Sequence, residues 1–335
     1  MRFLDRNGGE TKAKLKAALH QLARDQREQL IVTAPDGAPV ACYALVEAER
    51  NLQVPLLRLA DHAIAPTLGR QLLWHLREQA RTRGCSVVDI TDPHLPPHLQ
   101  NIARREHYQH VGDHWYAVVV DQIGTGAEIS AATTQAYRQA GLAAAPLIPA
   151  RIDADTAHHY ERVWWPAKII DSELPHFAVL IRPVWSSELF GVPAPLLKRR
   201  ADLAFGREQV YFRSGRNSTL TTPSRILWYM SSSRRDGPAA IIGTSLLDGI
   251  TTGTPDELFT AYGHYGVYHL ANIYDAARDG RAQVLQLSDT ELFPKPVDRK
   301  NYDRLLRIHK GPQSIQSPVN VSPELFTAIY RLGQG

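Results

Sequence analysis

The chain has 335 residues, 44% of them hydrophobic, and its 38 basic and 34 acidic residues leave a formal net charge of +4. A chain of this length is too long for one small core and is expected to form two domains. The mild positive charge permits an anionic partner without requiring one. With two cysteines and no apolar run near the roughly 20 residues of a membrane span, the composition excludes a disulfide-rich fold and a membrane-spanning fold.

The cysteines and the opening residues predict a compartment. Cys42 and Cys85 both lie inside apolar runs, which is typical of buried thiols in a reducing environment. The opening stretch MRFLDRNGGETK lacks the apolar core of a signal peptide. We therefore expect a cytoplasmic protein with no disulfide and no contact with a membrane.

The first 122 residues alternate between helical and strand patterns. An amphipathic helix is expected over 11–28, where leucines recur at helical spacing. Residues 30–48 predict a β-hairpin around the turn signal Asp36-Gly37. The later elements are a strand over 54–64, a helix over 67–84, a buried strand over 85–91, a short helix over 97–107 and a last strand over 114–121. This order predicts an α/β (α+β) fold, a mixed sheet flanked by helices.

The sequence changes character after this first part. From Gln122 to Ala150 it is rich in Ala, Gly, Thr and Pro with little periodicity, which is typical of a linker, although residues 129–141 could form a helix within it. Residues 158–175 lead into a second region. We therefore expect domains over 1–122 and 173–335, joined by a connecting segment over 123–172.

The second region consists of many short strands and a few small helices. A helix is well signalled by Thr254 as its N-cap, Pro255 in its first turn and Glu257 three residues after the cap. A final helix begins at Ser322-Pro323. Strands are expected within residues 177–185, 210–214, 225–231, 239–250 and 283–293. Together these elements predict a small mixed β-barrel with helices.

Residues 64–120 carry the run TLGRQLLWHLREQARTRGCSVVDIT, followed after a second helix by HYQHVGDHWYAVVV. This arrangement resembles the GNAT family of N-acetyltransferases. In that family a turn of the pattern Q/R-x-x-G-x-G/A precedes the long helix and binds the CoA pyrophosphate through backbone N–H groups. The resemblance implies acetyl-CoA as the cofactor, bound by Thr67, Leu68, Gly69 and Arg70. Of the three motif positions only Gly69 is kept.

The acid–base residues of the GNAT family are less well matched. The family's proton donor is usually a tyrosine about five residues before a Gly-Phe pair; here Ala103 takes the place of that tyrosine, and His107-Tyr108 the place of Gly-Phe. The catalytic candidates are Asp61, His62 and Tyr108, because a neutral imidazole or a carboxylate can deprotonate an amine through water. The alternative is that Asp61 and His62 are merely polar residues at the end of a strand.

Residues 175–297 carry five motifs in a fixed order: LIRPVWSSELFG, GREQVYFR, ILWYMSSS, AAIIGTSLLDGI and TPDELFTAYG. Their order and spacing resemble the ASCH family, part of the PUA-like superfamily of small barrels that bind RNA or modified bases. In that family the first strand ends in I-K-P and the second motif reads G-x-K-x-x-E-x-R. The resemblance implies a PUA-like (ASCH) small β-barrel whose ligand is RNA or a nucleotide.

The ASCH positions are only partly kept. Arg182 replaces the lysine of the first motif and retains its charge, while Gly206 and Arg213 keep the outer positions of the second. Glu208 stands where that motif has its lysine, and Tyr211 where it has glutamate or threonine. Some small ASCH proteins hydrolyse acylated cytidine with this lysine and its partner, so Glu208 disfavours that activity here.

What remains suits binding. Arg182 and Arg213 could hold a phosphate or a base edge bidentately. Tyr211 and Trp185 could offer a stacking face to a base, with Arg216 on the rim of the cleft. The alternative for each residue is structural, an aromatic ring packed in the core or an arginine salt-bridged at a strand end.

A pair of histidines and a basic run are the two other groupings that could carry function. His158 and His159 lie near Glu161, but adjacent histidines point to opposite faces of a strand and further ligands are not sensibly spaced, so no metal is expected. The basic run LLKRRADLAF over 196–205 could follow a nucleic-acid backbone or form a solvated helix face.

These observations lead to one hypothesis and one rival. The hypothesis is an acyltransferase that moves an acetyl group from acetyl-CoA to an amine, fused to a barrel that recognises RNA or a nucleotide and so selects the substrate; a protein partner is also compatible with it. The rival is a non-catalytic nucleic-acid-binding or regulatory protein, of the kind found in toxin–antitoxin or defence pairs, in which the GNAT fold is a scaffold. The acetyl acceptor and the oligomeric state are left open by the sequence.

Overall fold

The computed structural model describes the chain apart from residues 1–2, 4–8, 26, 34–36, 61–64, 192–206, 216–218, 233–238, 312–314 and 316–317. Three predicted site residues, Asp61, His62 and Arg216, lie outside the described residues, and so does the basic run over 196–205.

The first half of the chain forms a six-stranded sheet in the order β1-β2-β3-β4-β6-β5. Its strands are β1 (Glu28–Thr33), β2 (Pro39–Ala48), β3 (Asn51–Leu59), β4 (Val87–Ile90), β5 (Gln109–Val111) and β6 (His114–Val118). The strands pair antiparallel except β3 and β4, which are parallel because a helix crosses between them. The predicted hairpin over residues 30–48 is confirmed as β1 and β2.

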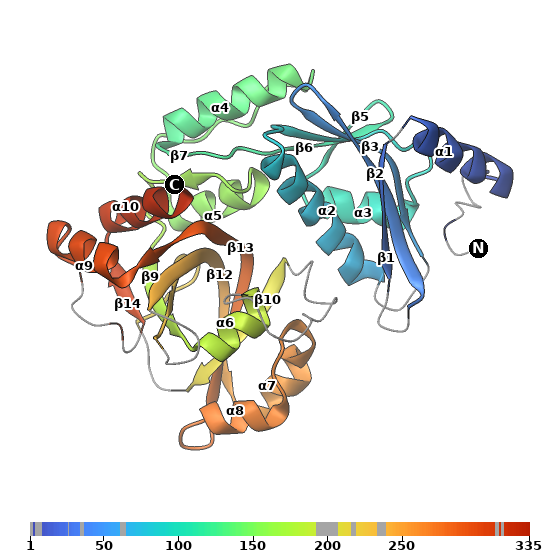
Figure 1. The fold of residues 1–335 in the computed structure, drawn as a ribbon. Coiled ribbons are helices and arrows are strands. Elements are labelled where there is room, and N and C mark those ends of the chain that lie inside the picture. Colours follow the sequence, from blue (N-terminus) through green and yellow to red (C-terminus); the bar gives the residue numbers. More distant parts are fainter. Residues whose placement is uncertain are drawn as a thin grey trace.

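Three helices accompany this sheet: α1 (Lys12–Arg24), α2 (Ala65–Thr82) and α3 (Pro97–Arg105). The apolar side of α2 is buried against the sheet, as its spacing predicts, and contributes Leu72, Leu73 and Leu76 to the core. Helix α1 is different, since none of its residues is buried. It lies at the outer edge of the sheet, beside β1 (Figure 1).

The connecting segment is folded. It consists of β7 (Ile123–Gly124), α4 (Gly126–Gln139), α5 (Ala154–Val163) and β8 (Lys168–Ile169), and β7 pairs with β8. Helix α4 confirms the helix considered over 129–141 and starts with a capping box between Thr125 and Glu128. Trp164 and Trp165 are almost fully buried below it. The segment therefore packs into a core that it shares with Val118, Val120 and Leu246, and its proposed bounds at 122 and 172 stay a prediction.

The second half forms a strongly bent six-stranded sheet in the order β10-β13-β12-β11-β9-β14, which we call the barrel. Its strands are β9 (His176–Ile181), β10 (Glu208–Ser214), β11 (Ser224–Met230), β12 (Ala240–Gly253), β13 (Ala282–Asp298) and β14 (Val319–Val321). Its helices are α6 (Pro183–Phe190), α7 (Pro255–Tyr262), α8 (Leu270–Ala276), α9 (Arg299–Ile308) and α10 (Pro323–Gln334). Separate apolar cores cover the two faces of this sheet, so it is buried on both sides.

The long strands β12 and β13 give the barrel its bend. Their pairing shifts register three times, and such bulges or irregularities add local twist. At one shift Gly243 lies so close to β13 that a Cβ atom would be 2.4 Å from the backbone oxygen of Glu291. Only glycine permits this approach.

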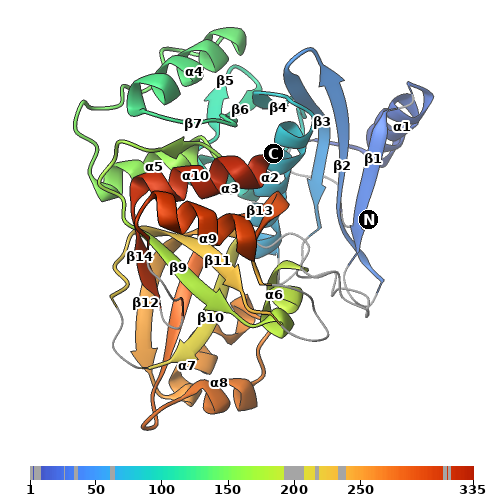
Figure 2. The same ribbon diagram turned by 60° about the vertical axis from the view of Figure 1, so that its left-hand side comes forward.

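Helix α2 lies between the first sheet and the barrel and joins them (Figures 1 and 2). Arg81 of α2 contacts the buried Glu291 of β13 at 2.5 Å. Glu106, at the end of α3, makes a buried ion pair with Arg207, just before β10. The two halves are thus held together by buried charges. The fold is a mixed α/β structure built on two six-stranded sheets, as the sequence predicts.

Candidate functional site

Two arginines of the barrel lie beside one tyrosine. Arg182 is the N-cap of α6 and is exposed, and Arg213 is close to the end of β10. Burial raises the pKa of the Tyr211 hydroxyl, while the charges of Arg213 and Arg182 act against this rise. The Tyr211 hydroxyl also donates to the Leu180 oxygen at 3.3 Å, so β10 contacts β9 close to Arg182. Arg182 and Arg213 thus each lie two residues along the chain from this contact, and their binding of a ligand stays a prediction.

Neither arginine is neutralised within the described part of the chain. No carboxylate there forms an ion pair with Arg182 or Arg213. The Nη1 atom of Arg213 is buried and has no hydrogen-bond partner among the described residues, and burial lowers the pKa of this side chain. A desolvated cation with an unused donor is costly unless an anion or an acceptor binds it.

Gln283 provides the complementary acceptor. It stands directly opposite Arg213 in the pairing of β10 with β13, so the two side chains share a face of the sheet. Gln283 is 7% exposed, and its Oε1 atom has no partner among the described residues, while Nε2 donates to Thr252 Oγ1 at 3.4 Å. Gln283 thus sets an unused acceptor on the face of the sheet that carries the unused donor of Arg213. The sequence did not indicate Gln283, because only the strand register places it there.

Aromatic rings form the wall behind these groups. Trp185, half-buried on α6, lies against Tyr268 with 4.4 Å between ring centroids. Tyr211 is 8% exposed, packs edge-on against Trp228, and donates its hydroxyl to the Leu180 oxygen at 3.3 Å. The ring of Tyr211 is therefore packed in the core, which is the alternative to a stacking role. Trp185 is the ring that retains an accessible surface for stacking.

The turn predicted to hold the cofactor lies within helix α2. The helix begins before Thr67, so the amides of Gly69 and Arg70 lie past its first turn and bond to carbonyls four residues earlier. A Cβ atom on Gly69 would be 2.7 Å from the terminal methyl group of Ile102 on α3, so this glycine lets the two helices pack closely. Leu68 is buried in the core and Thr67 is exposed.

The cation of this turn is already paired. Arg70 Nη1 lies 3.0 Å from Glu208 Oε1 of the barrel, and each side chain is 33% exposed. Glu208 is the residue that replaces the lysine of the ASCH motif. Glu208 of the ASCH-like motif therefore neutralises Arg70 of the GNAT-like turn. An anionic cofactor at this turn would have to displace Glu208.

Strand β4 ends before its neighbour does. Strands β3 and β4 pair from Asn51 with Val87 to Val54 with Ile90, where β4 ends, while β3 continues to Leu59. Beyond the paired residues, Asp92 Oδ2 accepts the backbone N–H of Leu57 at 2.7 Å. This strand edge is thus capped by a side chain of the protein itself. Together with the Arg70 pair, this means that the described residues do not fit acetyl-CoA in their present arrangement.

Tyr108, the described catalytic candidate, is a core residue. Its hydroxyl donates to the Leu73 oxygen at 2.6 Å, the guanidinium of Arg77 lies 5.2 Å from its ring centre, and burial raises the pKa of Tyr108 to about 12. A phenol held in this way keeps its proton at neutral pH. Its catalytic role stays a prediction that this placement does not favour.

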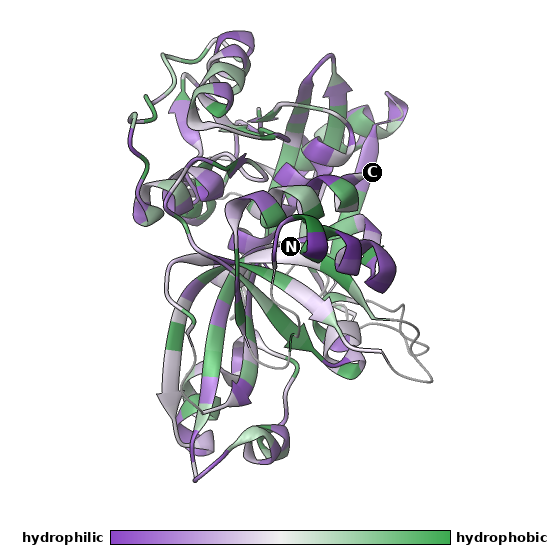
Figure 3. Cartoon of the chain, turned by 90° about the vertical axis from the view of Figure 1, so that its left-hand side faces the viewer, coloured by the Kyte–Doolittle hydropathy of each residue, from purple (hydrophilic) through white to green (hydrophobic). Residues whose placement is uncertain are grey.

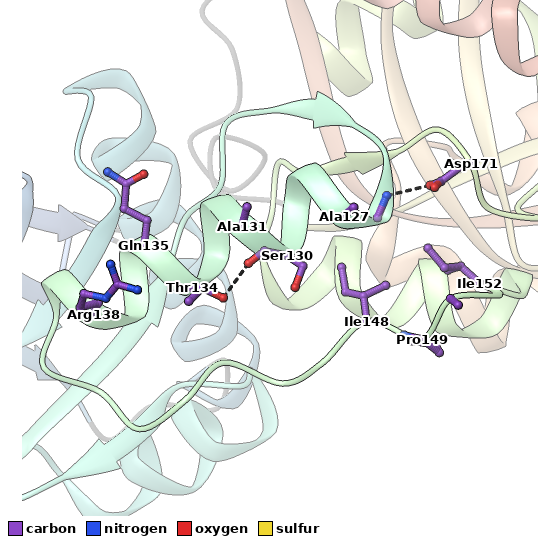
Figure 4. A pocket seen from close by; sticks show the side chains of 12 residues that line it. Ala127, Ser130, Ala131, Thr134, Gln135, Arg138, Ile148, Pro149, Ile152 and Asp171 are labelled. Carbon is purple, nitrogen blue, oxygen red and sulfur yellow. Dashed lines mark hydrogen bonds between the residues drawn. The ribbon is translucent and has the colours of Figure 1, made fainter.

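Two cavities are lined by described residues elsewhere. One of about 540 Å³ lies between α2 and the barrel, where Arg70 is paired with Glu208, and Arg162 with Asp248 at 3.2 Å. A second cavity of about 690 Å³ lies between α4 and the loop over 148–152 (Figure 4). Neither cavity contains the Arg182–Arg213 pair.

The described residues contain neither a group of metal ligands nor a helix that could span a membrane. No group of three or more His, Cys, Asp and Glu side chains in these ranges could hold a metal ion. His158 is hydrogen-bonded to Asp248 at 2.7 Å, and His159 packs on His107. Among the described helices, none combines the length and the apolar character needed to span a bilayer.

Comparisons with known proteins give fold likenesses only. No protein-family model matches the chain, and no curated protein matches its sequence. ASCH from Zymomonas mobilis shares 18% identity over 47% of this chain and 94% of its own, at a TM-score of 0.36. An acetyltransferase from Bacillus cereus shares 13% identity over 32% of this chain and 89% of its own, at a TM-score of 0.22. The N-terminal domain of Staphylothermus marinus McrB shares 14% identity over 47% of this chain and 93% of its own, at a TM-score of 0.31.

Both kinds of fold that the motifs resemble, ASCH and acetyltransferase, thus occur among the structural neighbours. At these identities and TM-scores the likeness carries no argument about activity.

Proposed function

We propose that this protein binds single-stranded RNA or a nucleotide at a site on the barrel formed by Arg182, Arg213, Gln283 and Trp185, which we call the cleft, and that its GNAT-like half serves as a rigid scaffold. The observation that carries the proposal is the placement of Arg182 and Arg213 beside Tyr211, with no carboxylate of the described residues neutralising either of them. Unpaired arginines beside an accessible ring are what an anionic, planar ligand requires.

Each group in the cleft has a separate task in this proposal. Arg182, exposed at the start of α6, contacts a phosphate, and the first turn of α6 adds its partial positive charge. Arg213 and Gln283 face the edge of a base with a donor and an acceptor. Trp185 stacks on the face of the base. The protein does no bond-making chemistry in this scheme.

The wider setting belongs to the same proposal. The free thiols of Cys42 and Cys85 support a reducing compartment such as the cytoplasm. The division of the chain at residues 122 and 172 is kept, with the connecting segment as a folded joint between scaffold and barrel. A regulatory role in a toxin–antitoxin or defence pair fits a binding protein of this kind.

The test is equilibrium binding of the full chain to a fluorescein-labelled single-stranded RNA of mixed sequence. The double variant Arg182→Gln with Arg213→Gln should raise the Kd at least about tenfold, because a hydrogen bond to a charged group contributes about 1.5–3 kcal/mol. It removes no ion pair that the described residues make, so its thermal unfolding should match the wild type.

A matched control removes the same charge far from the cleft. Arg24→Gln with Arg27→Gln changes two exposed arginines of the first half, at and after α1. This variant should bind RNA as the wild type does. Equal Kd values for the cleft variant and the wild type, or no binding by the wild type at micromolar protein, would contradict the proposal; nucleoside monophosphates titrated in parallel separate nucleotide from RNA binding.

A second candidate function is acetyl transfer from acetyl-CoA to an amine. The cavity beside Arg70 favours it. It requires Arg70 to exchange Glu208 for the cofactor, so Glu208→Gln should strengthen any binding of acetyl-CoA. Calorimetric titration of the wild type and of this variant decides the matter, and the absence of heat from both at millimolar cofactor removes this candidate.

A further inference from the structure

Helix α9 has one strongly basic face. Its apolar side, with Tyr302 and Leu305, is buried against the barrel. On the opposite side Lys300, Arg304 and Arg307 are all exposed, and their spacing of four and three residues places them in one row. We call this row the α9 stripe. Figure 3 shows α9 facing the viewer as a hydrophilic helix on the outside of the barrel.

The charges of the α9 stripe are not compensated by the described part of the chain. Arg299, at the start of the helix, pairs with Asp303 at 3.0 Å. No other ion pair involves the helix, and no described carboxylate lies within 4.0 Å of Lys300, Arg304 or Arg307. Like charges three and four residues apart destabilise a helix slightly, so an anionic partner along this face would be stabilising.

The strand register places the start of α9 in the same row of the sheet as the end of β9, next to Arg182. Asp298, the N-cap of α9, pairs with Ala240, which pairs with Met230, which in turn pairs with Ile181. These four residues form one row across β13, β12, β11 and β9. With about 4.8 Å between neighbouring strands, the row spans about 15 Å. Arg182 follows its last residue directly.

We infer that the α9 stripe is a phosphate-backbone site that continues the cleft, so that the strand held at Arg182 and Arg213 passes across the end of the barrel onto α9. The inference rests on the proposed function and adds a second surface to it. A helix of ten residues is about 15 Å long, which is comparable with the row of strands that separates its start from Arg182. A strand of a few nucleotides would reach the cleft alone, and a longer one would reach both.

The test compares two labelled single-stranded RNAs, of about 4 and about 16 nucleotides, the range that single binding modules cover. The variant Lys300→Gln, Arg304→Gln, Arg307→Gln should bind the short RNA as the wild type does and the long RNA more weakly. For the long RNA the slope of log K against log salt should become shallower by about 2, since each contact to a single-stranded phosphate contributes about 0.7.

The control variant is Lys12→Gln, Lys14→Gln, Lys16→Gln, which removes three exposed lysines from α1 on the other half of the molecule. It should leave the slope for the long RNA unchanged. Equal slopes for the α9 variant and the wild type overturn the inference while leaving the cleft intact, if the Arg182 and Arg213 variant still loses binding. Loss of binding to phosphatidylserine vesicles without any change in RNA binding assigns the stripe to a lipid surface and also overturns it.

Discussion

Glu291 is the residue on which the junction between the two halves depends. It is 2% exposed and contacts Arg81 at 2.5 Å, Lys168 at 3.2 Å and the Tyr330 hydroxyl at 2.8 Å. Burial raises the pKa of Glu291, but the charges of Lys168 and Arg81 outweigh this effect and hold the pKa below its ordinary value. The carboxylate is therefore ionised at neutral pH and is matched by two cations.

Replacing this carboxylate should destabilise the whole chain. Glu291→Gln leaves the buried Lys168 without a counter-charge and leaves Arg81 with only Asp121 at 3.1 Å, and losing one partner of a buried ion pair typically costs about 3–5 kcal/mol. We expect a loss of that size in the free energy of unfolding, measured by urea titration.

The half-exposed pair of Arg70 and Glu208 gives the comparison. Glu208→Gln should change the free energy of unfolding by at most about 1 kcal/mol, because water screens that pair. If the two substitutions cost the same, burial does not set the strength of these contacts and the account of the junction is wrong.

At the scale of the elements, helix ends were well signalled and long strands were not. The predicted cap of α7 is confirmed: Thr254 accepts the N–H of Glu257, and Glu257 accepts the N–H of Thr254 at 2.9 Å. Strand β13 is longer than expected, since it runs through Pro294 and Pro296 to Asp298. These prolines lie between Leu292 and Val297, where the pairing with β12 shifts and no ladder hydrogen bond is required of them.

The cap of α7 provides the test at this scale. Thr254→Ala removes the acceptor of the capping box and should lower the free energy of unfolding by about 1 kcal/mol. Thr260→Ala is the matched control, because Thr260 is exposed within the same helix and alanine is the better helix former there. A loss from the control as large as that from the cap variant would mean that capping is not what secures this helix.

At the scale of the whole molecule, the two halves behave as one body rather than as two tethered domains. Helix α2 contacts the barrel through Arg70 and Arg81, and Arg77 of the same helix donates to the backbone oxygens of Arg162 at 3.0 Å and Val163 at 2.8 Å. Buried polar contacts of this kind cannot be released one half at a time without leaving charges unpaired.

We therefore expect a single cooperative unfolding transition. In scanning calorimetry the measured enthalpy should equal the van't Hoff enthalpy for the full chain. Glu291→Gln should separate the transition into two or broaden it, because it weakens the shared junction. Two well-resolved transitions in the wild type would show that the halves are independent and that the connecting segment is a tether.

The motifs predicted the two kinds of fold and the pair of arginines, because local order and charge can be read along the chain. They did not indicate Gln283, Asp92 or the pairing of Arg70 with Glu208. Each of these depends on which residue faces which across a strand or a junction, and that is a property of register and packing. Tyr211 is a further example. The alternation of side chains along a strand places it on the same face as Arg213, but only the packed structure shows that its ring is buried.

The sequence by itself determined the mixed α/β architecture, the helix caps and the set of residues able to bind an anion, since these follow from periodicity, propensity and charge within short windows. The tertiary structure decided which of those residues are free to bind. It neutralised Arg70 with a carboxylate 138 positions away, left Arg213 without a partner among the described residues, and brought the start of α9 to the end of the barrel that carries Arg182. Whether a charge is available is set by what surrounds it in space, and no short window of sequence contains that information.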